Sequence, residues 1–217
     1  MAYVIIVGAG TYGERITRET AENGHNVVLV EKDEDTAKSM ATDIDGVVIQ
    51  GDATDAEILE EAGIEECDIL LSTVSDSSVN VLVTLLAREY EIDKIVAVAT
   101  SQRHTDILEK VGADAVERPK QLVSENLSHY VEEPLITNFL SLGDEKDVVK
   151  ILVSEDSDIE GRQIGNLDSK LPEKSLIVAI QRDSSVVIPK GNSKIVEGDY
   201  VTIACNREDV SEIESLF

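Results

Sequence analysis

A short glycine-rich loop, placed between an apolar run and a helical pattern, constrains the fold of this chain more than any other feature. Residues 3–7 (YVIIV) form a continuous apolar run, which is typical of a strand buried on both faces of a parallel sheet. The sequence Gly8-Ala9-Gly10-Thr11-Tyr12-Gly13 follows at once, and residues 11–23 have helical spacing that ends at Gly24. A strand, a loop of the GxGxxG form and a helix, in this order, predict the first unit of a parallel sheet that binds a dinucleotide.

The same strand-and-helix alternation continues to about residue 118. Short apolar runs recur at residues 26–30, 46–49, 68–71, 95–99 and 113–116. Helical patterns separate them at residues 33–44, 55–62, 75–90 and 105–111. Such alternation implies right-handed crossovers between parallel strands. Residues 1–118 are therefore predicted to form an α/β domain with a Rossmann-like, doubly wound parallel sheet.

The remaining residues predict a linker helix and a second, smaller α+β domain. Apolar residues recur at helical spacing over 119–142, and Pro134 is expected to kink or break this helix near Glu133. The pattern leaves open whether the helix packs on its own domain or crosses to a partner subunit. Residues 119–143 are assigned to this linker and the polar turn 143–147 to the boundary. Residues 144–217 are assigned to the smaller domain, with strands at 148–153, 175–181, 186–188 and 200–204 and a closing helix at 207–216.

Charge and composition exclude several classes of partner. The formal net charge is −25, so binding to a nucleic-acid backbone or to an anionic lipid surface is not expected. The excess of carboxylates is interpreted as adaptation to a salt-rich, halophilic cytoplasm rather than as solvated helix faces alone. The chain shows no signal peptide and no apolar run long enough to span a bilayer, so a soluble cytoplasmic protein without direct membrane insertion is expected.

Each glycine of the loop has a predicted physical role in binding phosphate. Gly8 permits the tight turn, Gly10 lets a pyrophosphate approach the backbone, and Gly13 lets the helix pack closely on its strand. The phosphates are expected on the amides of residues 9–12, at the positive end of the helix. The loop contains no lysine or arginine, so its backbone must supply most of the binding.

Further candidate cofactor-binding residues lie at or near the ends of the second to fifth strands. Glu31 ends the second strand, where a carboxylate accepts hydrogen bonds from both ribose hydroxyls and disfavours a 2′-phosphate, so NAD is favoured over NADP. Asp52 follows the third strand and is predicted either to contact an adenine amino group or to cap the next helix, with Thr54 and Asp55 as competing caps. The other candidates are the neighbouring loop residues Ala53, Thr73 and Val74, and Arg103 near the fifth strand.

No catalytic residue or metal ligand is predicted. The three histidines, His25, His104 and His129, are scattered along the chain and have no evident acid–base partner. Cys67 and Cys205 lie in different predicted domains and are expected to be buried, reduced thiols.

Several segments resemble the RCK/KTN domains of TrkA-type potassium-transport regulators. The likeness includes VIIVGAGTYGERIT (4–17), VVLVEKD (27–33), VVIQGDATDAEILEEAGIEECD (47–68), TVSDSSVNVLVTLLAR (73–88) and ILEKVGADAVERPKQLV (107–123). IEGRQIGNL (159–167) and VVIPKGNSKIVEGDYVTIAC (186–205) resemble the TrkA-C domain of the same family. The resemblance covers nearly the whole chain.

This resemblance implies a cytoplasmic subunit that assembles on a TrkH/KtrB-like potassium-transporting membrane protein. It implies self-association through the long helix into a ring of dimers, from tetramer to octamer, gated by NAD(H) or ADP/ATP. It also implies nucleotide contacts at Gly8, Gly10, Gly13, Glu31, Asp52 and Thr73. Some relatives bind cyclic di-AMP or small cations, but the residues here show no pattern for either.

The sequence departs from the family at two positions that bear on ligand choice. Thr11 stands where members often carry arginine, and Ala99-Thr100 ends the fifth strand where a second arginine is frequent. Arg103 is the nearest cation, so a two-phosphate ligand is favoured over ATP. A nucleotide-gated regulator of potassium uptake is the leading hypothesis. The alternatives are a small NAD-dependent oxidoreductase, for which no catalytic pair is found, and an NAD-binding scaffold without a partner.

Overall fold

The structure is a computed structural model that describes residues 1–132, 135–142, 145–167 and 170–217. It divides into two compact units, Met1–Gln121 and Leu122–Phe217. No helix within the described residues is both long enough and apolar enough to cross a membrane.

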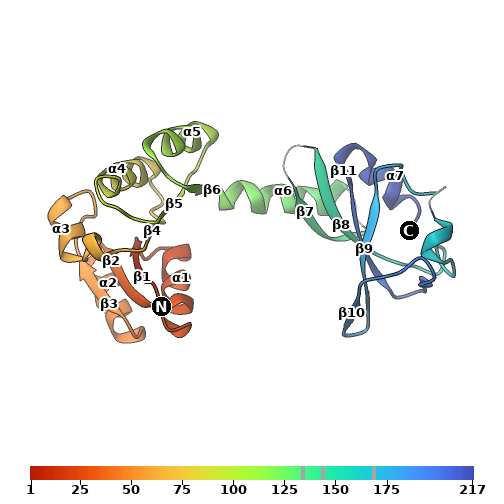
Figure 1. Ribbon diagram of the computed structural model, residues 1–217, viewed down its shortest axis with the longest axis horizontal. Helices are drawn as coiled ribbons and strands as arrows, with labels where there is room; N and C mark the ends of the chain where they lie inside the picture. The colour runs from red at the N-terminus through yellow and green to blue at the C-terminus, as the bar shows by residue number, and fades with distance from the viewer. Residues whose placement is uncertain (133–134, 143–144, 168–169) are drawn as a thin grey trace. The chain divides into compact units, whose positions relative to one another are not determined.

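The first unit is built on a six-stranded sheet in which every neighbouring pair is parallel (Figure 1). The strand order is β3-β2-β1-β4-β5-β6, so the direction of winding reverses between β1 and β4. The strands are β1 (Tyr3–Val7), β2 (Asn26–Glu31), β3 (Val47–Gln50), β4 (Ile69–Ser72), β5 (Lys94–Val98) and β6 (Ala115–Glu117). The predicted Rossmann-like doubly wound sheet is confirmed.

Helices cover both faces of this sheet because alternate residues of the central strand point to opposite sides. Val4 and Ile6 pack with residues of α1 and α2, whereas Ile5 and Val7 pack with residues of α3 and α4. Residues of α5 pack with those of α4, and the two helices lie side by side in Figure 1. The helices are α1 (Thr11–Glu22), α2 (Glu34–Asp43), α3 (Ala56–Glu61), α4 (Ser77–Ala87) and α5 (Gln102–Val111), with a short 3₁₀ helix at Ile64–Glu66.

Side-chain caps explain where several helices begin. The carboxylates of Asp33, Asp55 and Asp76 accept backbone N–H groups at the starts of α2, α3 and α4. Ser101 caps α5 by accepting the His104 N–H, so this helix begins at Gln102, three residues earlier than the apolar spacing predicts.

The prediction of a helix over 119–142 is wrong in its second half. Helix α6 (Pro119–Glu132) is followed by strand β7 (Ile136–Ser141). Ile136 and Phe139 are buried because β7 pairs antiparallel with β8 (Lys146–Leu152), a contact that local spacing does not reveal. The predicted kink at Glu133 and Pro134 lies outside the described residues.

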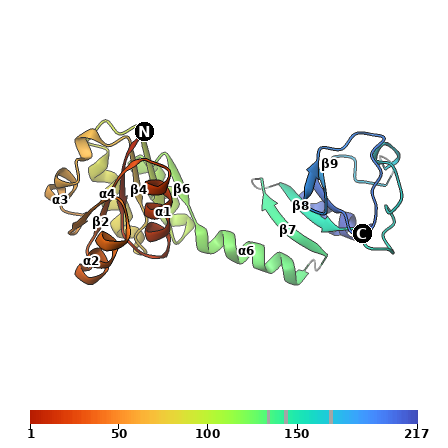
Figure 2. The ribbon, with the colours of Figure 1, turned by 90° about the horizontal axis from the view of Figure 1, so that it is seen from below.

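The second unit contains a five-stranded antiparallel sheet in the order β10-β9-β11-β8-β7. Figure 2 shows β7 beside β8 in this sheet. Strand β8 begins within the predicted boundary turn, of which Gly143 and Asp144 lie outside the described residues. The predicted closing helix is shorter than expected and is preceded by a 3₁₀ turn. The remaining elements are a 3₁₀ helix at Ile164–Asn166, β9 (Leu176–Arg182), β10 (Ser185–Val187), β11 (Tyr200–Asn206), a 3₁₀ helix at Arg207–Asp209 and α7 (Val210–Glu214).

One face of this second sheet carries its own apolar core. Val149, Ile151, Val201 and Ile203 are fully buried there with Ile213 of α7. Strands pairing with an appended helix agree with the predicted smaller C-terminal α+β domain.

Candidate nucleotide-binding site

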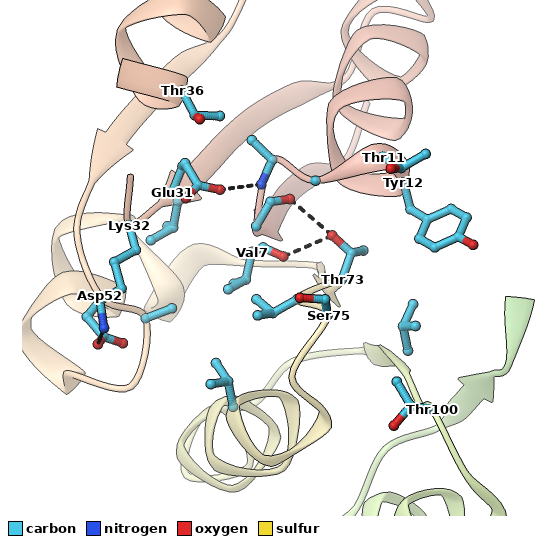
Figure 3. A pocket seen from close by; sticks show the side chains of 18 of the residues that line it. Val7, Thr11, Tyr12, Glu31, Lys32, Thr36, Asp52, Thr73, Ser75 and Thr100 are labelled. Atoms are coloured by element: carbon cyan, nitrogen blue, oxygen red, sulfur yellow. Dashed lines mark hydrogen bonds and ion pairs between the residues drawn. The ribbon is translucent and has the colours of Figure 1, made fainter. Parts of the chain in front are cut away.

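A pocket of about 550 Å³ lies at the carboxyl edge of the parallel sheet, where the direction of winding reverses between β1 and β4. Ligands of doubly wound folds bind at this reversal point. Figure 3 shows Glu31, Lys32 and Asp52 on one side of the pocket, and Thr100 at a distance from them on the other. The lining residues come from the ends of β1 to β5 and the loops after them, from α1, α2 and α4, and from the start of α6.

The glycine loop has the geometry that its sequence predicts. Gly8 has a φ of +89°, a left-handed conformation that favours glycine. A Cβ built on Gly13 would lie 1.7 Å from the Gly8 carbonyl oxygen, so only glycine lets α1 approach the loop this closely. A Cβ on Gly10 would meet no atom within 4 Å. The space above Gly10 is therefore open to a ligand, whereas Gly13 is a packing position.

Glu31 is fixed between the glycine loop and the start of α2. Its carboxylate accepts the Ala9 N–H at 2.6 Å (Figure 3) and the Asp33 N–H at 2.8 Å. Glu31 lines the pocket, so a carboxylate is available at the end of β2 for hydroxyl donors of a ligand.

Asp52 is held at the pocket wall by an ion pair and a local turn. Lys32 Nζ lies 2.7 Å from one carboxylate oxygen (Figure 3), and the backbone and hydroxyl of Thr54 both donate to the other. The hydrogen bond from Lys32 and those from Thr54 lower the pKa of Asp52 to about 2. Asp55, and not Asp52, caps α3, which leaves Asp52 as a lining residue with a local structural role.

Thr73 and Asn80 fix the floor of the pocket. The Thr73 hydroxyl donates to the Val7 carbonyl at 3.0 Å and lies 3.1 Å from that of Gly8 (Figure 3). The fully buried Asn80 amide accepts from the Val74 N–H and donates to the carbonyls of Val74 and Val98.

Asn80 supports the pocket wall and was not predicted from the sequence pattern. It bridges the ends of β4 and β5, which form adjacent parts of the pocket wall. The signal available in the sequence was one amide in a helical stretch whose other polar residues are all hydroxyl-bearing, SSVNVLVTLLA.

Most of the predicted site residues are brought together by the fold. The residues that line the pocket are Gly8, Ala9, Gly10, Thr11, Tyr12, Glu31, Asp52, Ala53, Thr73 and Val74. Gly13 lies buried beneath the loop, and Arg103 is exposed on the first turn of α5; neither lines the pocket. Thr100 lines it near that position, with its hydroxyl 2.9 Å from that of Ser77. The polar lining residues that sequence reasoning did not assign are Lys32, Thr36, Ser75, Thr100 and Lys120.

The described residues show no arrangement of three or more His, Cys, Asp and Glu side chains suited to a metal ion. His25 accepts the Ala2 N–H, and His104 lies 3.0 Å from the Ser101 hydroxyl. Neither histidine lines the pocket. Cys67 and Cys205 are free and buried, and desolvation raises the pKa of the Cys67 thiol.

A doubly wound sheet, a glycine loop over an open pocket and an acid at the end of β2 define a class of protein, the Rossmann-type nucleotide-binding domains. Residues 4–119 match the family model of the TrkA-N domain, and residues 148–217 match that of the TrkA-C domain. The chain therefore belongs to the TrkA family.

Similar proteins carry potassium-uptake names. The chain is 28% identical to a Trk system potassium uptake protein TrkA homolog of Methanothermobacter thermautotrophicus, covering 99% of each chain. It is 26% identical to Ktr system potassium uptake protein C of Bacillus subtilis, covering 96% of this chain and 94% of the relative.

A solved structure of the GsuK channel bound to NAD is similar at a TM-score of 0.68 and 19% identity. The match covers 99% of this chain and 39% of the channel chain, so this protein spans well under half of that relative. At this level of identity the likeness concerns the fold.

Proposed function

We propose that this chain is a nucleotide-sensing regulatory subunit of a Trk/Ktr-type potassium uptake system. The observation that carries the proposal is the pocket over Gly10, with the Glu31 carboxylate at one end and the start of α1 at the other. A helix start and free space above the loop suit a diphosphate, and a carboxylate at the end of β2 suits a ribose. The proposed ligand is NAD(H) or ADP/ATP.

The names of the relatives support the proposed role. The Methanothermobacter and Bacillus proteins are named as parts of potassium uptake systems, and the GsuK channel binds NAD. We therefore assign this chain to the cytoplasmic face of the membrane, where it would act on a potassium-transporting subunit. The potassium-uptake names of these relatives favour regulation over enzymatic turnover.

The exposed face of α6 supports self-association. Monomeric soluble proteins rarely expose large contiguous apolar patches. The large apolar side chains on this helix are 48% to 81% exposed: Leu122, Val123, Leu127, Tyr130 and Val131. A second copy covering this face would form the dimer from which a ring is built. In this proposal residues 1–118 form the nucleotide-binding domain, α6 joins the subunits, and the C-terminal domain begins with β7.

The net charge of −25 supports a further part of the proposal, adaptation to high salt. Salt screens repulsion between the surface carboxylates, so the free energy of unfolding is expected to rise with KCl concentration. Full stability in dilute buffer would contradict this adaptation.

Regulation requires that the nucleotide bind two states of the assembly with different affinity. The test is nucleotide titration of the purified protein alone and of the protein bound to its transporter in detergent. A tenfold difference corresponds to about 1.4 kcal/mol of coupling. Equal affinities would contradict gating, and efficient NADH turnover with a carbonyl substrate would instead favour an oxidoreductase.

A further inference from the structure

One cation that lines the pocket belongs to α6 and not to the loops that follow β1 to β5. Lys120 is the second residue of α6 and lines the pocket together with Pro119. It reaches this edge because β6 is parallel to β5 and ends there, two residues before α6 begins.

Charge is distributed unevenly around the pocket. Glu31 and Asp52 lie on the β2 and β3 side, where Asp52 pairs with Lys32 at 2.7 Å. The β4 to β6 side is lined by hydroxyl and apolar residues and contributes no carboxylate: Val74, Ser75, Val98, Ala99, Thr100 and Pro119. Lys120 is the cation among the lining residues on this second side.

This arrangement predicts which end of a nucleotide lies near Lys120. With the ribose at Glu31 and the first phosphates over Gly10, the remainder of the ligand extends toward β4 and β5. An additional phosphoryl group there would interact favourably with an ammonium, whereas the positively charged nicotinamide ring of NAD⁺ would not.

We propose that Lys120 is a specificity-determining residue that binds the terminal phosphoryl group of an adenosine polyphosphate. The inference rests on the proposed nucleotide site. Lys120 supplies, from α6, a cation that neither the glycine loop nor the end of β5 contains. Because Lys120 belongs to α6, the charge of the ligand acts directly on the start of the helix that leads into the second unit.

The test is calorimetric titration with AMP, ADP, ATP and NAD⁺ in the presence of EDTA, using wild type, Lys120→Met and Lys120→Arg. Lys110→Met is the matched control, because Lys110 is exposed on α5 and does not line the pocket. Wild type is expected to bind ATP and ADP more tightly than AMP. Lys120→Met should lose about tenfold or more in affinity for ATP, and less than about threefold for ADP and AMP, whose phosphates lie over Gly10.

Lys120→Arg should retain most of the ATP affinity, and the Lys110 variant should match wild type. Hydrogen exchange provides a second readout: ATP, but not AMP, should protect the amides of the first turns of α6 in wild type and not in Lys120→Met. Equal changes for AMP and ATP, or none, would overturn the role of Lys120 while leaving the nucleotide site intact. Binding of none of the four ligands by wild type would overturn the proposed function and this inference together.

Discussion

The carboxylate of Glu31 accepts the backbone N–H of Ala9 at 2.6 Å, so the end of β2 is tied directly to the glycine loop that follows β1. The same carboxylate lines the pocket. A ligand ribose held by Glu31 and a diphosphate held by the loop would therefore contact two parts of the site that are already joined. This connection makes Glu31 both a recognition group and a support for the loop.

Replacing Glu31 separates these two roles. Glu31→Gln keeps the shape but removes the charge that favours ribose hydroxyl donors, so NAD affinity should fall about ten- to a hundredfold. NADP should lose less, because the repulsion between a carboxylate and a 2′-phosphate is relieved. Calorimetric titration of both ligands measures the change, with the exposed α2 residue changed in Glu34→Gln as the control. Equal losses for NAD and NADP would indicate that Glu31 only supports the loop.

The two glycines on either side of Thr11 and Tyr12 should respond in opposite ways to alanine. Gly13→Ala places a Cβ 1.7 Å from the Gly8 carbonyl oxygen, so unfolding should become easier by about 3 kcal/mol. Gly10→Ala meets no protein atom, and stability should change by about 1 kcal/mol or less, since Gly10 is only the N-cap of α1. Its methyl group occupies the phosphate position, so nucleotide binding should be lost. Chemical unfolding and titration of both variants test this; a Gly10→Ala protein that binds nucleotide normally would argue against a ligand there.

The buried Asn80 side chain is predicted to stabilise the folded protein. Asn80→Leu leaves the Val74 N–H and the Val98 carbonyl without their side-chain partner, which should cost about 2–4 kcal/mol in urea unfolding. Thr84→Val is the control on the same helix, because the buried Thr84 hydroxyl has no hydrogen-bond partner and its loss should be nearly neutral. Asn80→Asp should also be destabilised, since a carboxylate cannot donate to either carbonyl. If Asn80→Leu unfolds like wild type, the bridge between β4 and β5 is not a support of the pocket.

The second unit contains a carboxylate that should shape its acid unfolding. Asp199 is buried, which opposes its ionisation, but hydrogen bonds from Arg182 at 2.7 and 2.8 Å and from Val196 hold its pKa below the ordinary value. The contribution to stability is present above about pH 4 and is lost as the pH falls through the folded-state pKa.

Asp199→Asn should therefore flatten the fall in unfolding free energy between pH 5 and about pH 3. At pH 7 it should lower stability by about 1–3 kcal/mol, with the half-exposed Arg182 remaining solvated. Asp156→Asn, at an exposed turn position, is the control. Parallel pH profiles for wild type and Asp199→Asn would contradict the assigned role.

Local pattern predicted the parts of the fold whose signals are themselves local. The apolar run 3–7 and the glycines at 8, 10 and 13 specify β1, its turn and α1 within one short stretch. Glu31 and Asp52 could be assigned because the carboxyl ends of parallel strands meet at one edge of a sheet.

The features that were missed depend on contacts distant in sequence. Residues 136–141 have apolar positions compatible with a helix and become a strand through pairing with β8. Lys120 lines the pocket because β6 runs parallel to the other strands and ends at the same carboxyl edge of the sheet as β1. Sequence spacing within 119–142 contains neither piece of information.

The central claim, a nucleotide-binding site over the glycine loop, is tested most directly by calorimetric titration of the wild-type protein in molar KCl. NAD, NADH, ADP and ATP are each titrated, with the well-folded Gly10→Ala variant as the matched negative control. Saturable binding of at least one ligand to wild type, and its loss in Gly10→Ala, is the predicted result. Absence of binding by all four ligands, or binding that Gly10→Ala leaves unchanged, would contradict the account.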